Sequence, residues 1–494
     1  MYPDDLTEQQ QVRREKAAEL KEKGIEPFGH KYIRTHHTKD IIEHYDAFDH
    51  DQLEEKHVNV SIAGRIVLKR RQGKAGFMHV QDRDGQIQVY VRKDMIGDDA
   101  YAVFIQSDLG DIVGITGYVF RTNTGELTVK AESYTHLSKA LRPLPDKYHG
   151  LQDKEEARRR RYVDLIVNDD ARRVAMTRPK IIRAIQNYFD QKGFIEVETP
   201  VLQSILGGAA ARPFTTYHNT LDMPFYLRIA TELPLKRLIV GGLEAVYEIG
   251  RLFRNEGMDA KHNPEFTTIE AYQAYADMDD MMDIVEGCLS TVTHDILGSY
   301  DIQYQDITLH MGVPWKRVHM VDAIKDITGV DFWQPMTLDE AKALAKTHHV
   351  DVQKHFGYGH IVEAFFAQFV EETIIQPTMV YGHPIEISPL AKKNEKDPRF
   401  TDRFELFIMR SEYANAFSEL NDPIDQRERF ENQLKEKALG NDEANEMDVD
   451  FVEALEYGMP PTGGLGIGID RFIMLLTNTP NIRDVILFPH LKNR

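Results

Sequence analysis

Residues 251–272 read RLFRNEGMDAKHNPEFTTIEAY. Their pattern predicts two strands joined by a polar loop, and residues two apart on a strand point to the same side. Arg254 and Glu256 would then share one side of the first strand. One side of the second strand would carry Phe266, Thr268, Glu270 and Tyr272. Paired as a hairpin, the strands would present an arginine, two carboxylates, an aromatic ring and a phenol to one pocket.

The alternative is a solvent-facing sheet along which charges simply alternate. Phe266 and Tyr272 argue against that alternative, because it would expose two large aromatic side chains to water. A purely structural buried sheet would not carry so many charged groups on one face. We therefore favour a binding pocket, with the exposed sheet as the alternative.

Another informative stretch is rich in glycine: residues 461–471 read PTGGLGIGIDR. Glycines at 464, 466 and 468 resemble a dinucleotide-binding fingerprint, but Ile469 stands where GxGxxG needs its third glycine. The chain has no Walker A sequence either. Glycines at alternate positions predict a strand with one bare face, against which a flat group can lie. Arg471 would open the next helix with a guanidinium suited to stacking or to a phosphate.

Residues 405–419, ELFIMRSEYANAFSE, also combine a strand-like pattern with polar side chains at alternate positions. Asn415, Phe417 and Glu419 would share one face of a strand. Glu405 and Glu412 offer carboxylate oxygens, which hard divalent cations prefer as ligands. Their odd separation puts them on opposite faces of one straight strand. A turn or bulge must therefore intervene if the two carboxylates share a site.

Composition limits the class of protein. A chain of 494 residues, 42% hydrophobic and 28% charged, is long enough for two or three globular domains and is not globally disordered. It contains no long uncharged apolar run, so we expect no membrane span. The N-terminus lacks the apolar segment of a secretory signal, and a single cysteine, Cys288, excludes intrachain disulfides and a cysteine-rich metal site. We expect a cytoplasmic protein.

The net charge of −19 argues on its face against a nucleic-acid partner. The charge is unevenly distributed, however. Residues 58–145 hold 12 Lys or Arg against 9 Asp or Glu, so this span is near +3 and the remainder near −22. A locally basic module on an acidic body can still hold a phosphate backbone, so the total charge does not decide the matter.

The same span has a strand-like period of two. Five strand candidates, at residues 58–71, 76–82, 86–93, 111–122 and 127–137, are separated by turns that include RDGQ and NTGE. Five short strands with a basic bias predict a small barrel of the OB type, and other five-stranded barrels are the alternative.

Helices are expected on both sides of this barrel. Residues 6–23 predict a charged helix ending at Gly24, either a solvated surface helix or one with a basic face toward RNA. The arginine run 158–161 predicts a solvated helix face, with phosphate contact as the alternative. Residues 169–193 are expected to be helical. They lead into GFIEVETP at 193–200, a helix end followed by a strand that proline stops, which is a weak signal alone.

Together these blocks resemble the signature motifs of the class II aminoacyl-tRNA synthetases, in the expected order. The subgroup with an N-terminal OB fold contains the aspartyl, asparaginyl and lysyl enzymes. The chain is similar to the lysyl family in particular, over essentially its whole length, at GGAAARPF (207–214), YLRIATEL (226–233), RNEG (254–257), HNPEF (262–266) and FSELND (417–422).

The resemblance implies a multidomain α+β fold. An N-terminal five-stranded OB-fold β-barrel would precede a class II catalytic domain built on an antiparallel sheet flanked by helices. The expected domains are an N-terminal helical extension (1–56), an OB-fold anticodon-binding domain (57–145), a linker (146–168) and the catalytic domain (169–494). The corner at 193–200 resembles the family's dimer-interface motif, which implies a homodimer.

The resemblance also implies roles for individual residues. Arg254 would bind the α-phosphate of ATP and the substrate carboxylate, and Arg471 with His262 would reach the distal phosphates or the adenine face. Phe266 would stack on adenine and Glu256 would hydrogen-bond the base. Glu405 and Glu412 would bind Mg²⁺. The catalytic residues would be Arg254 and Arg471.

The implied lysine site comprises Gly208 and Glu232 for the α-amino group, Asn415 for the carboxylate, Glu419 with Tyr272 for the ε-ammonium, and Glu270. In the OB domain, Phe77 and Gln88 match positions that read the anticodon. A selective lysine pocket needs separately placed carboxylates, since burying an unpaired ammonium is prohibitive. An aspartate pocket would need an extra cation where Glu419 stands.

The implied activity is a lysine–tRNA ligase that forms lysyl-adenylate from L-lysine and ATP with Mg²⁺, then transfers lysine to tRNA(Lys). One alternative is a lysine-activating relative that modifies a protein, although such relatives typically lack the OB domain. Another is a non-catalytic RNA-binding protein, against which Arg254, Phe266 and Arg471 argue. Departures from the family pattern are Lys261 where arginine is frequent, Ala271 where a larger apolar residue is usual, and the ending FPHLKNR.

Overall fold

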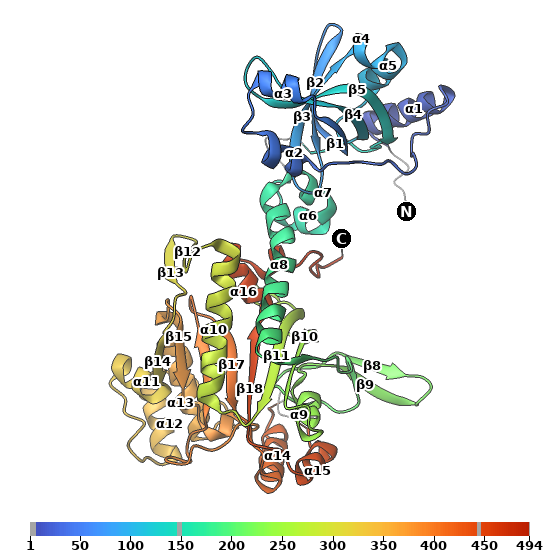
Figure 1. The fold of residues 1–494 in the computed structure, drawn as a ribbon. Coiled ribbons are helices and arrows are strands. Elements are labelled where there is room, and N and C mark those ends of the chain that lie inside the picture. The colour runs from blue at the N-terminus through green and yellow to red at the C-terminus, as the bar shows by residue number, and fades with distance from the viewer. Residues whose placement is uncertain (1–5, 146–150, 442–445, 494) are drawn as a thin grey trace. The chain divides into compact units, whose positions relative to one another are not determined.

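A computed structural model describes residues 6–145, 151–441 and 446–493. Contacts between residues divide the chain into two units, an N-terminal unit (Met1–Gln152) and a C-terminal unit (Asp153–Arg494). Figure 1 shows the elements of both units. Among the described residues, no helix is both long and apolar enough to cross a membrane.

The N-terminal unit is built on a closed barrel with the strand order β1-β2-β3-β5-β4. The strands are β1(Asn59–Gln72), β2(Ala75–Gln81), β3(Gln86–Arg92), β4(Ile112–Arg121) and β5(Leu127–Ser138). Neighbours pair antiparallel except β3 and β5, which pair parallel. On β3, buried residues alternate with more exposed ones, and Ile87, Val89 and Val91 point inward. The predicted five-stranded barrel is confirmed.

Helices cover this barrel. They are α1(Glu8–Glu22), α2(Thr38–Tyr45), α3(His50–Lys56), α4(Lys93–Ile96) and α5(Asp98–Gln106). The helix expected at 6–23 is therefore confirmed as α1. It begins at the N-cap Thr7, whose side chain accepts a hydrogen bond from Gln10 N, and Gly24 follows it in the left-handed region with φ +76°.

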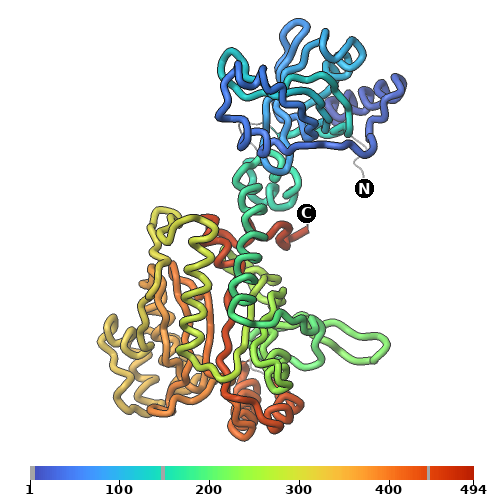
Figure 2. Tube along the Cα trace, viewed as in Figure 1, coloured from blue at the N-terminus to red at the C-terminus, as the bar shows by residue number. Residues whose placement is uncertain are grey.

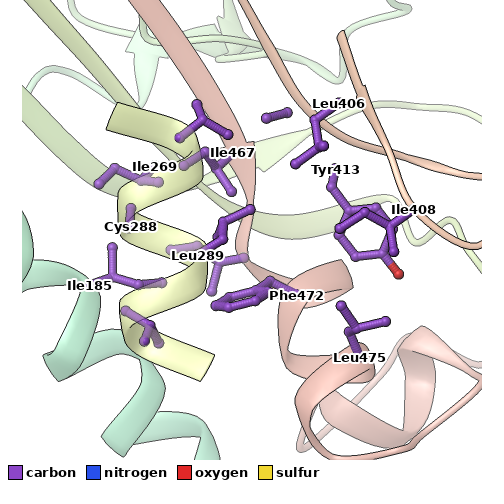
Figure 3. Packing of buried hydrophobic residues seen from close by; sticks show 14 of the residues in the cluster. Ile185, Ile269, Cys288, Leu289, Leu406, Ile408, Tyr413, Ile467, Phe472 and Leu475 are labelled. Atoms are coloured by element: carbon purple, nitrogen blue, oxygen red, sulfur yellow. The ribbon is translucent and has the colours of Figure 1, made fainter. Parts of the chain in front are cut away.

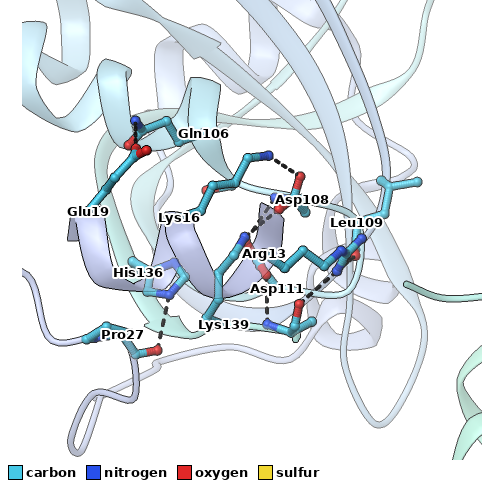
Figure 4. A network of polar contacts seen from close by, with 12 residues as sticks. Arg13, Lys16, Glu19, Pro27, Gln106, Asp108, Leu109, Asp111, His136 and Lys139 are labelled. Carbon is cyan, nitrogen blue, oxygen red and sulfur yellow. Dashed lines mark hydrogen bonds and ion pairs between the residues drawn. The ribbon is translucent and has the colours of Figure 1, made fainter. Parts of the chain in front are cut away.

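Basic side chains of α1 hold the helix against the barrel (Figure 4). Arg13 donates a 2.8 Å hydrogen bond to the carbonyl of Ala140, and Lys16 lies 2.6 Å from Asp108. The same Asp108 pairs with the buried Lys139 at 2.6 Å. These two side chains of α1 are thus bound within the unit rather than free for RNA.

The C-terminal unit is built on an eight-stranded sheet with the order β14-β15-β16-β17-β18-β11-β10-β6. In that order the strands are β14(Lys316–His319), β15(Thr378–Tyr381), β16(Arg403–Phe407), β17(Glu412–Ser418), β18(Thr462–Gly468), β11(Glu265–Ala274), β10(Ala245–Phe253) and β6(Ile195–Glu196). From β15 to β10 all pairs are antiparallel, as expected, whereas the outermost pair at each edge is parallel. The hairpin of β10 and β11 predicted from residues 251–272 is confirmed.

Helices and smaller sheets surround the large sheet. The helices are α6(Lys154–Arg159), α7(Arg161–Val167), α8(Asp169–Gln191), α9(Glu232–Val240), α10(Met278–Leu297), α11(Met320–Thr328), α12(Leu338–Thr347), α13(Tyr358–Phe369), α14(Pro423–Ala438), α15(Val449–Glu456), α16(Ile469–Leu476) and α17(Ile482–Val485), with 3₁₀ turns η1(Glu371–Thr373) and η2(Ile385–Ile387). The smaller strands are β7(Leu202–Gln203), β8(Thr215–His218), β9(Met223–Leu227), β12(Asp301–Tyr304) and β13(Ile307–His310). The hairpin of β8 and β9 projects from the body of this unit (Figure 2).

The main core lies between the sheet and α8, α10 and α16 (Figure 3). Cys288 and Leu289 of α10 are fully buried against sheet residues such as Ile269, and Phe472 of α16 joins them. Apolar side chains therefore fill this face of the sheet.

The arginine run 158–161 is not a solvated helix face, so that prediction is wrong for two of its members. Arg158 is buried and donates to Asp484 at 2.7 Å. Arg161 is buried too, and it donates to Asp164 and to the carbonyl of Arg483. A buried guanidinium needs such partners, and here Asp484 and Arg483 come from α17 while Asp164 comes from α7 itself. Residues 153–168 belong to the C-terminal unit, and residues 146–150 of the expected linker lie outside the described residues.

Candidate active site

A cavity of about 360 Å³ opens over the middle of the large sheet. It is lined from β11, β17 and β18, from the loop between β10 and β11, and from the start of α9. Every site residue predicted in this unit lines it: Gly208, Glu232, Arg254, Glu256, His262, Phe266, Glu270, Tyr272, Glu405, Glu412, Asn415, Glu419 and Arg471. Motifs far apart in the sequence therefore meet in one cavity.

The floor of the cavity is the glycine-rich strand β18. Tyr272 lies opposite Gly464 on one neighbouring strand, and Phe417 lies opposite it on the other. A methyl group on Gly464 would lie 2.0 Å from Glu419 Oε1, so only glycine leaves room for that carboxylate. At Gly466 nothing lies within 3.7 Å of such a methyl group. The bare strand face expected from alternating glycines is therefore a surface of the cavity.

Arg254 and Glu256 reach the cavity from a loop. The sequence interpretation placed them on a strand, but β10 ends at Phe253. The loop is held by backbone hydrogen bonds, among them Arg254 N to the carbonyl of Pro264 at 2.8 Å. The prediction that these two residues lie on a strand is wrong. The prediction that both side chains face one pocket is confirmed, because both line the cavity.

One end of the cavity is acidic and buried. Glu232, Glu270 and Glu419 are each less than 10% exposed. Glu270 accepts hydrogen bonds from Thr231 N at 3.1 Å and from the Tyr272 hydroxyl at 3.2 Å. Burial and the neighbouring Glu232 raise the pKa of Glu270 to about 7, and burial raises the pKa of Glu419 as well. This end is therefore suited to hold cations.

A further residue of this end, Lys236, was missed from the sequence. Its side chain is completely buried, 2.5 Å from Glu232 Oε1 and paired also with Glu419. The available signal was its position four residues after Glu232 on one helix, which puts both side chains on the same face.

The other end of the cavity is rich in cations. The Arg254 guanidinium lies 5.2 Å from the centre of the Phe266 ring, and its buried Nε has no hydrogen-bond partner among the described residues. Arg471 donates to the carbonyl of Glu412 at 2.5 Å and lies 3.1 Å from His262 Nε2. Lys261 lines this end, and its Nζ donates to the carbonyl of Arg410. Two arginines and a lysine beside an aromatic ring form an environment for a polyphosphate and a flat base.

Two carboxylates stand beside these cations. Glu405 is on β16 and Glu412 is on β17, and the tight turn at 408–411 lies between them, as the sequence analysis required. Burial and the neighbouring Glu405 raise the pKa of Glu412, because two nearby carboxylates resist ionising together. A divalent cation between them would relieve that repulsion, so the donor set fits a hard metal ion.

A second overlooked residue orders this pair. Arg403 donates to Glu405 at 2.6 Å and to Asn415 Oδ1 at 3.0 Å. It lies two residues before Glu405 on β16, so strand parity could have identified it.

Phe77 and Gln88 lie on adjacent strands of the barrel in the N-terminal unit. Both are partly exposed, while their neighbours Met78 and Val89 point inward. Phe77 lies opposite Tyr90, with ring centroids 4.7 Å apart. Gln88 is held by Glu126, to which it donates at 2.6 Å, and by the Thr128 hydroxyl at 3.0 Å. The outer barrel surface thus carries aromatic rings on which bases could stack.

The sequence was compared with models of protein families and with curated proteins. Residues 153–492 match the family model of tRNA synthetases class II (D, K and N). The chain belongs to the class II tRNA synthetases. The barrel of this synthetase matches the model of the OB-fold nucleic acid binding domain at residues 60–137, so the OB expectation is confirmed.

The synthetase is also similar to curated proteins over its full length. It is 60% identical over 491 residues to a lysine–tRNA ligase of Bacillus subtilis, covering 99% of this chain and 98% of that protein. It is 62% identical over 490 residues to one of Lysinibacillus sphaericus, again covering 99% and 98%. The identity to one of Bacillus mycoides is 59% over 494 residues, covering 100% of this chain and 99% of that protein.

Proposed function

We propose that this synthetase is a lysine–tRNA ligase. It activates L-lysine with ATP, releases pyrophosphate and transfers lysine to the 3′ end of tRNA(Lys). The observation that carries the choice of amino acid is the buried Glu419: its Oε1 has no hydrogen-bond partner among the described residues and lies over Gly464 in the cavity. The full-length relatives, all lysine–tRNA ligases, support the same conclusion.

The acidic end of the cavity accounts for lysine rather than a neutral or acidic amino acid. We assign the ε-ammonium to Glu419 and Tyr272, and the α-ammonium to Glu232 and Gly208. Glu270 completes this end, and Asn415 faces the substrate carboxylate. An amino acid without a second ammonium leaves a buried carboxylate unpaired, which costs strongly in binding.

The chemistry needs no nucleophilic side chain. The substrate carboxylate oxygen forms a bond to the α-phosphorus of ATP, and the bond from that phosphorus to the oxygen of the leaving pyrophosphate breaks. We assign the α-phosphate and the substrate carboxylate to Arg254, whose buried Nε has no other partner among the described residues. Arg471 and His262 bind the distal phosphates, Phe266 stacks on adenine and Glu256, at the exposed rim, holds the base.

A divalent cation fits beside this phosphate end. We propose Mg²⁺ as that cation, held by Glu405 and Glu412. When bound, it supplies positive charge that neutralises the phosphates during transfer. Arg403 orients Glu405 through its 2.6 Å hydrogen bond.

Two further features concern assembly and location. We propose a homodimer through residues 193–205, because β6 is an edge strand and Ile195, Val201, Leu202 and Ile205 are exposed around it. Light scattering should then give twice the mass of one chain.

We also propose that the enzyme works in the cytoplasm, where its tRNA substrate is used.

The decisive test is ATP–pyrophosphate exchange with each of the twenty amino acids, with Mg²⁺ and without tRNA. We expect exchange with lysine alone, and its loss when divalent cations are chelated. Exchange with aspartate or asparagine would keep the family and overturn the assignment of Glu419 and Tyr272. Absence of exchange with every amino acid would instead favour a non-catalytic RNA-binding protein.

The anticodon assignment predicts a separable defect. Phe77→Ala should lower kcat/KM for tRNA(Lys) by about 5- to 150-fold, because stacking one base on an aromatic ring contributes about 1–3 kcal/mol. Lysine-dependent exchange without tRNA should stay unchanged and serves as the internal control. An equal loss in both reactions would mean that the substitution disturbs the fold rather than a base contact.

A further inference from the structure

Beneath the acidic end of the cavity the protein has buried a lysine of its own. Lys236 is on α9 and has no exposed side-chain surface. Its ammonium pairs with Glu232 on the same helix and with Glu419 just after β17. The rings of Phe417 and Phe451 lie 5.5 and 5.8 Å from it. It therefore links the two carboxylates that we assign to the two ammonium groups of the substrate.

The buried cluster around Lys236 contains more carboxylates than cations. Glu232, Glu270 and Glu419 interact with one another and with the neutral phenol of Tyr272. Within the described part of the chain, Lys236 is the only cationic side chain that forms an ion pair with any of the three carboxylates. The next residue, Arg237, turns away and pairs with Asp448 and Asp450. Three carboxylates thus face one cation.

We propose that Lys236 is a positioning residue for amino-acid selection, supplying one of the three positive charges that this cluster needs when all three carboxylates are ionised. The proposal rests on the proposed function. An occupant with two ammonium groups then completes the balance, while an occupant with one leaves a buried negative charge. Lys236 also sets the spacing of Glu232 and Glu419, because its single ammonium is held by both.

The surroundings keep this lysine charged. Burial by itself lowers the pKa of Lys236, but Glu232 and Glu419 more than offset it, so the pKa is raised. In return the ammonium lowers the pKa of the Glu419 carboxyl, which burial raises. Without it the pKa of Glu419 would rise further, and a protonated Glu419 is a poorer acceptor for the substrate ammonium.

The test compares Lys236→Gln with Lys236→Arg in lysine-dependent ATP–pyrophosphate exchange. Glutamine keeps hydrogen-bonding capacity but removes the charge, and arginine keeps the charge. We expect K236Q to raise KM for lysine by about 100-fold with KM for ATP unchanged. Because Glu419 then ionises at higher pH, the acid limb of kcat/KM for lysine should move up by about one pH unit. K236R should keep the wild-type limb and a KM within about 10-fold.

Arg237→Gln is the matched control, since it weakens the contacts of α9 without touching the cavity. It should leave both the KM for lysine and the pH profile at wild-type values. A folded K236Q with wild-type KM and acid limb would overturn the proposal, and so would equal defects in K236Q and K236R. If K236Q does not fold, Lys236→Met carries the same comparison, because methionine fills a similar volume without charge. Wild-type exchange with lysine, measured in parallel, distinguishes failure of this proposal from failure of the proposed function.

Discussion

Replacing Arg254 with alanine is expected to lower lysine-dependent ATP–pyrophosphate exchange by about 1,000-fold or more. A guanidinium that stabilises developing charge on a transferring phosphoryl group is worth about 10³–10⁵ in rate, and one lost oxyanion donor about 10²–10³. The loss should appear mainly in kcat, because the interaction strengthens in the transition state. Single-turnover formation of lysyl-adenylate is the direct measurement.

Arg251→Ala is the matched control for this variant. Arg251 lies three residues earlier, near the end of β10, and its side chain pairs with Glu265 outside the cavity at 2.8 Å. Such a surface pair is worth little, so exchange and thermal stability should stay near the wild-type values. Retained exchange in R254A would contradict the assignment of Arg254 to the α-phosphate. An equal loss of exchange in R254A and R251A would contradict it too.

Replacing Glu419 with glutamine is expected to lower kcat/KM for lysine by about 1,000-fold, largely through KM. The amide fills nearly the same space, but the substrate ε-ammonium then lies in a buried site without its counterion. Removing one partner of a buried charged pair costs about 2–5 kcal/mol, and polar sites discriminate strongly against a mismatched group. KM for ATP should change little, since the phosphate end is untouched.

The matched control is Glu428→Gln, an exposed position on α14. That variant should keep wild-type values, because it removes the same charge from the surface. Steady-state exchange over lysine and ATP concentrations, with a thermal melt of each variant, gives the comparison. E419Q with wild-type KM for lysine would mean that the ε-ammonium is bound elsewhere in the cavity.

Sequence periodicity predicted the elements that carry the site. The five barrel strands and the β10–β11 hairpin were recovered because alternation of polar and apolar residues is a local property of a half-buried strand. Strand parity also brought Phe266, Glu270 and Tyr272 to one face. It failed at Arg254, because the polar loop of this hairpin begins directly after Phe253 and alternation of side chains does not mark a strand end.

Burial of charged residues was the main point at which the sequence misled. Four consecutive arginines at 158–161 have the pattern of a solvated helix, yet Arg158 and Arg161 are buried, with partners on α17 and at Leu487 just after it. Arg161 also pairs locally with Asp164, but Asp484, Arg483 and Leu487 lie more than three hundred residues away along the chain. No pattern within the helix itself contains that information.

By itself, the sequence determined the family, the barrel, the order of the motifs and the residue types of the active site. These properties follow from local periodicity and from short motifs, in which a few neighbouring residues define the chemistry. Only the tertiary structure decided how the charges are shared within the cavity. Lys236 meets Glu419 because α9 packs on β10 and β11, while Glu419 follows β17 in the same sheet. Burial, which depends on the whole fold, strengthens the interaction of this one ammonium with Glu232 and Glu419.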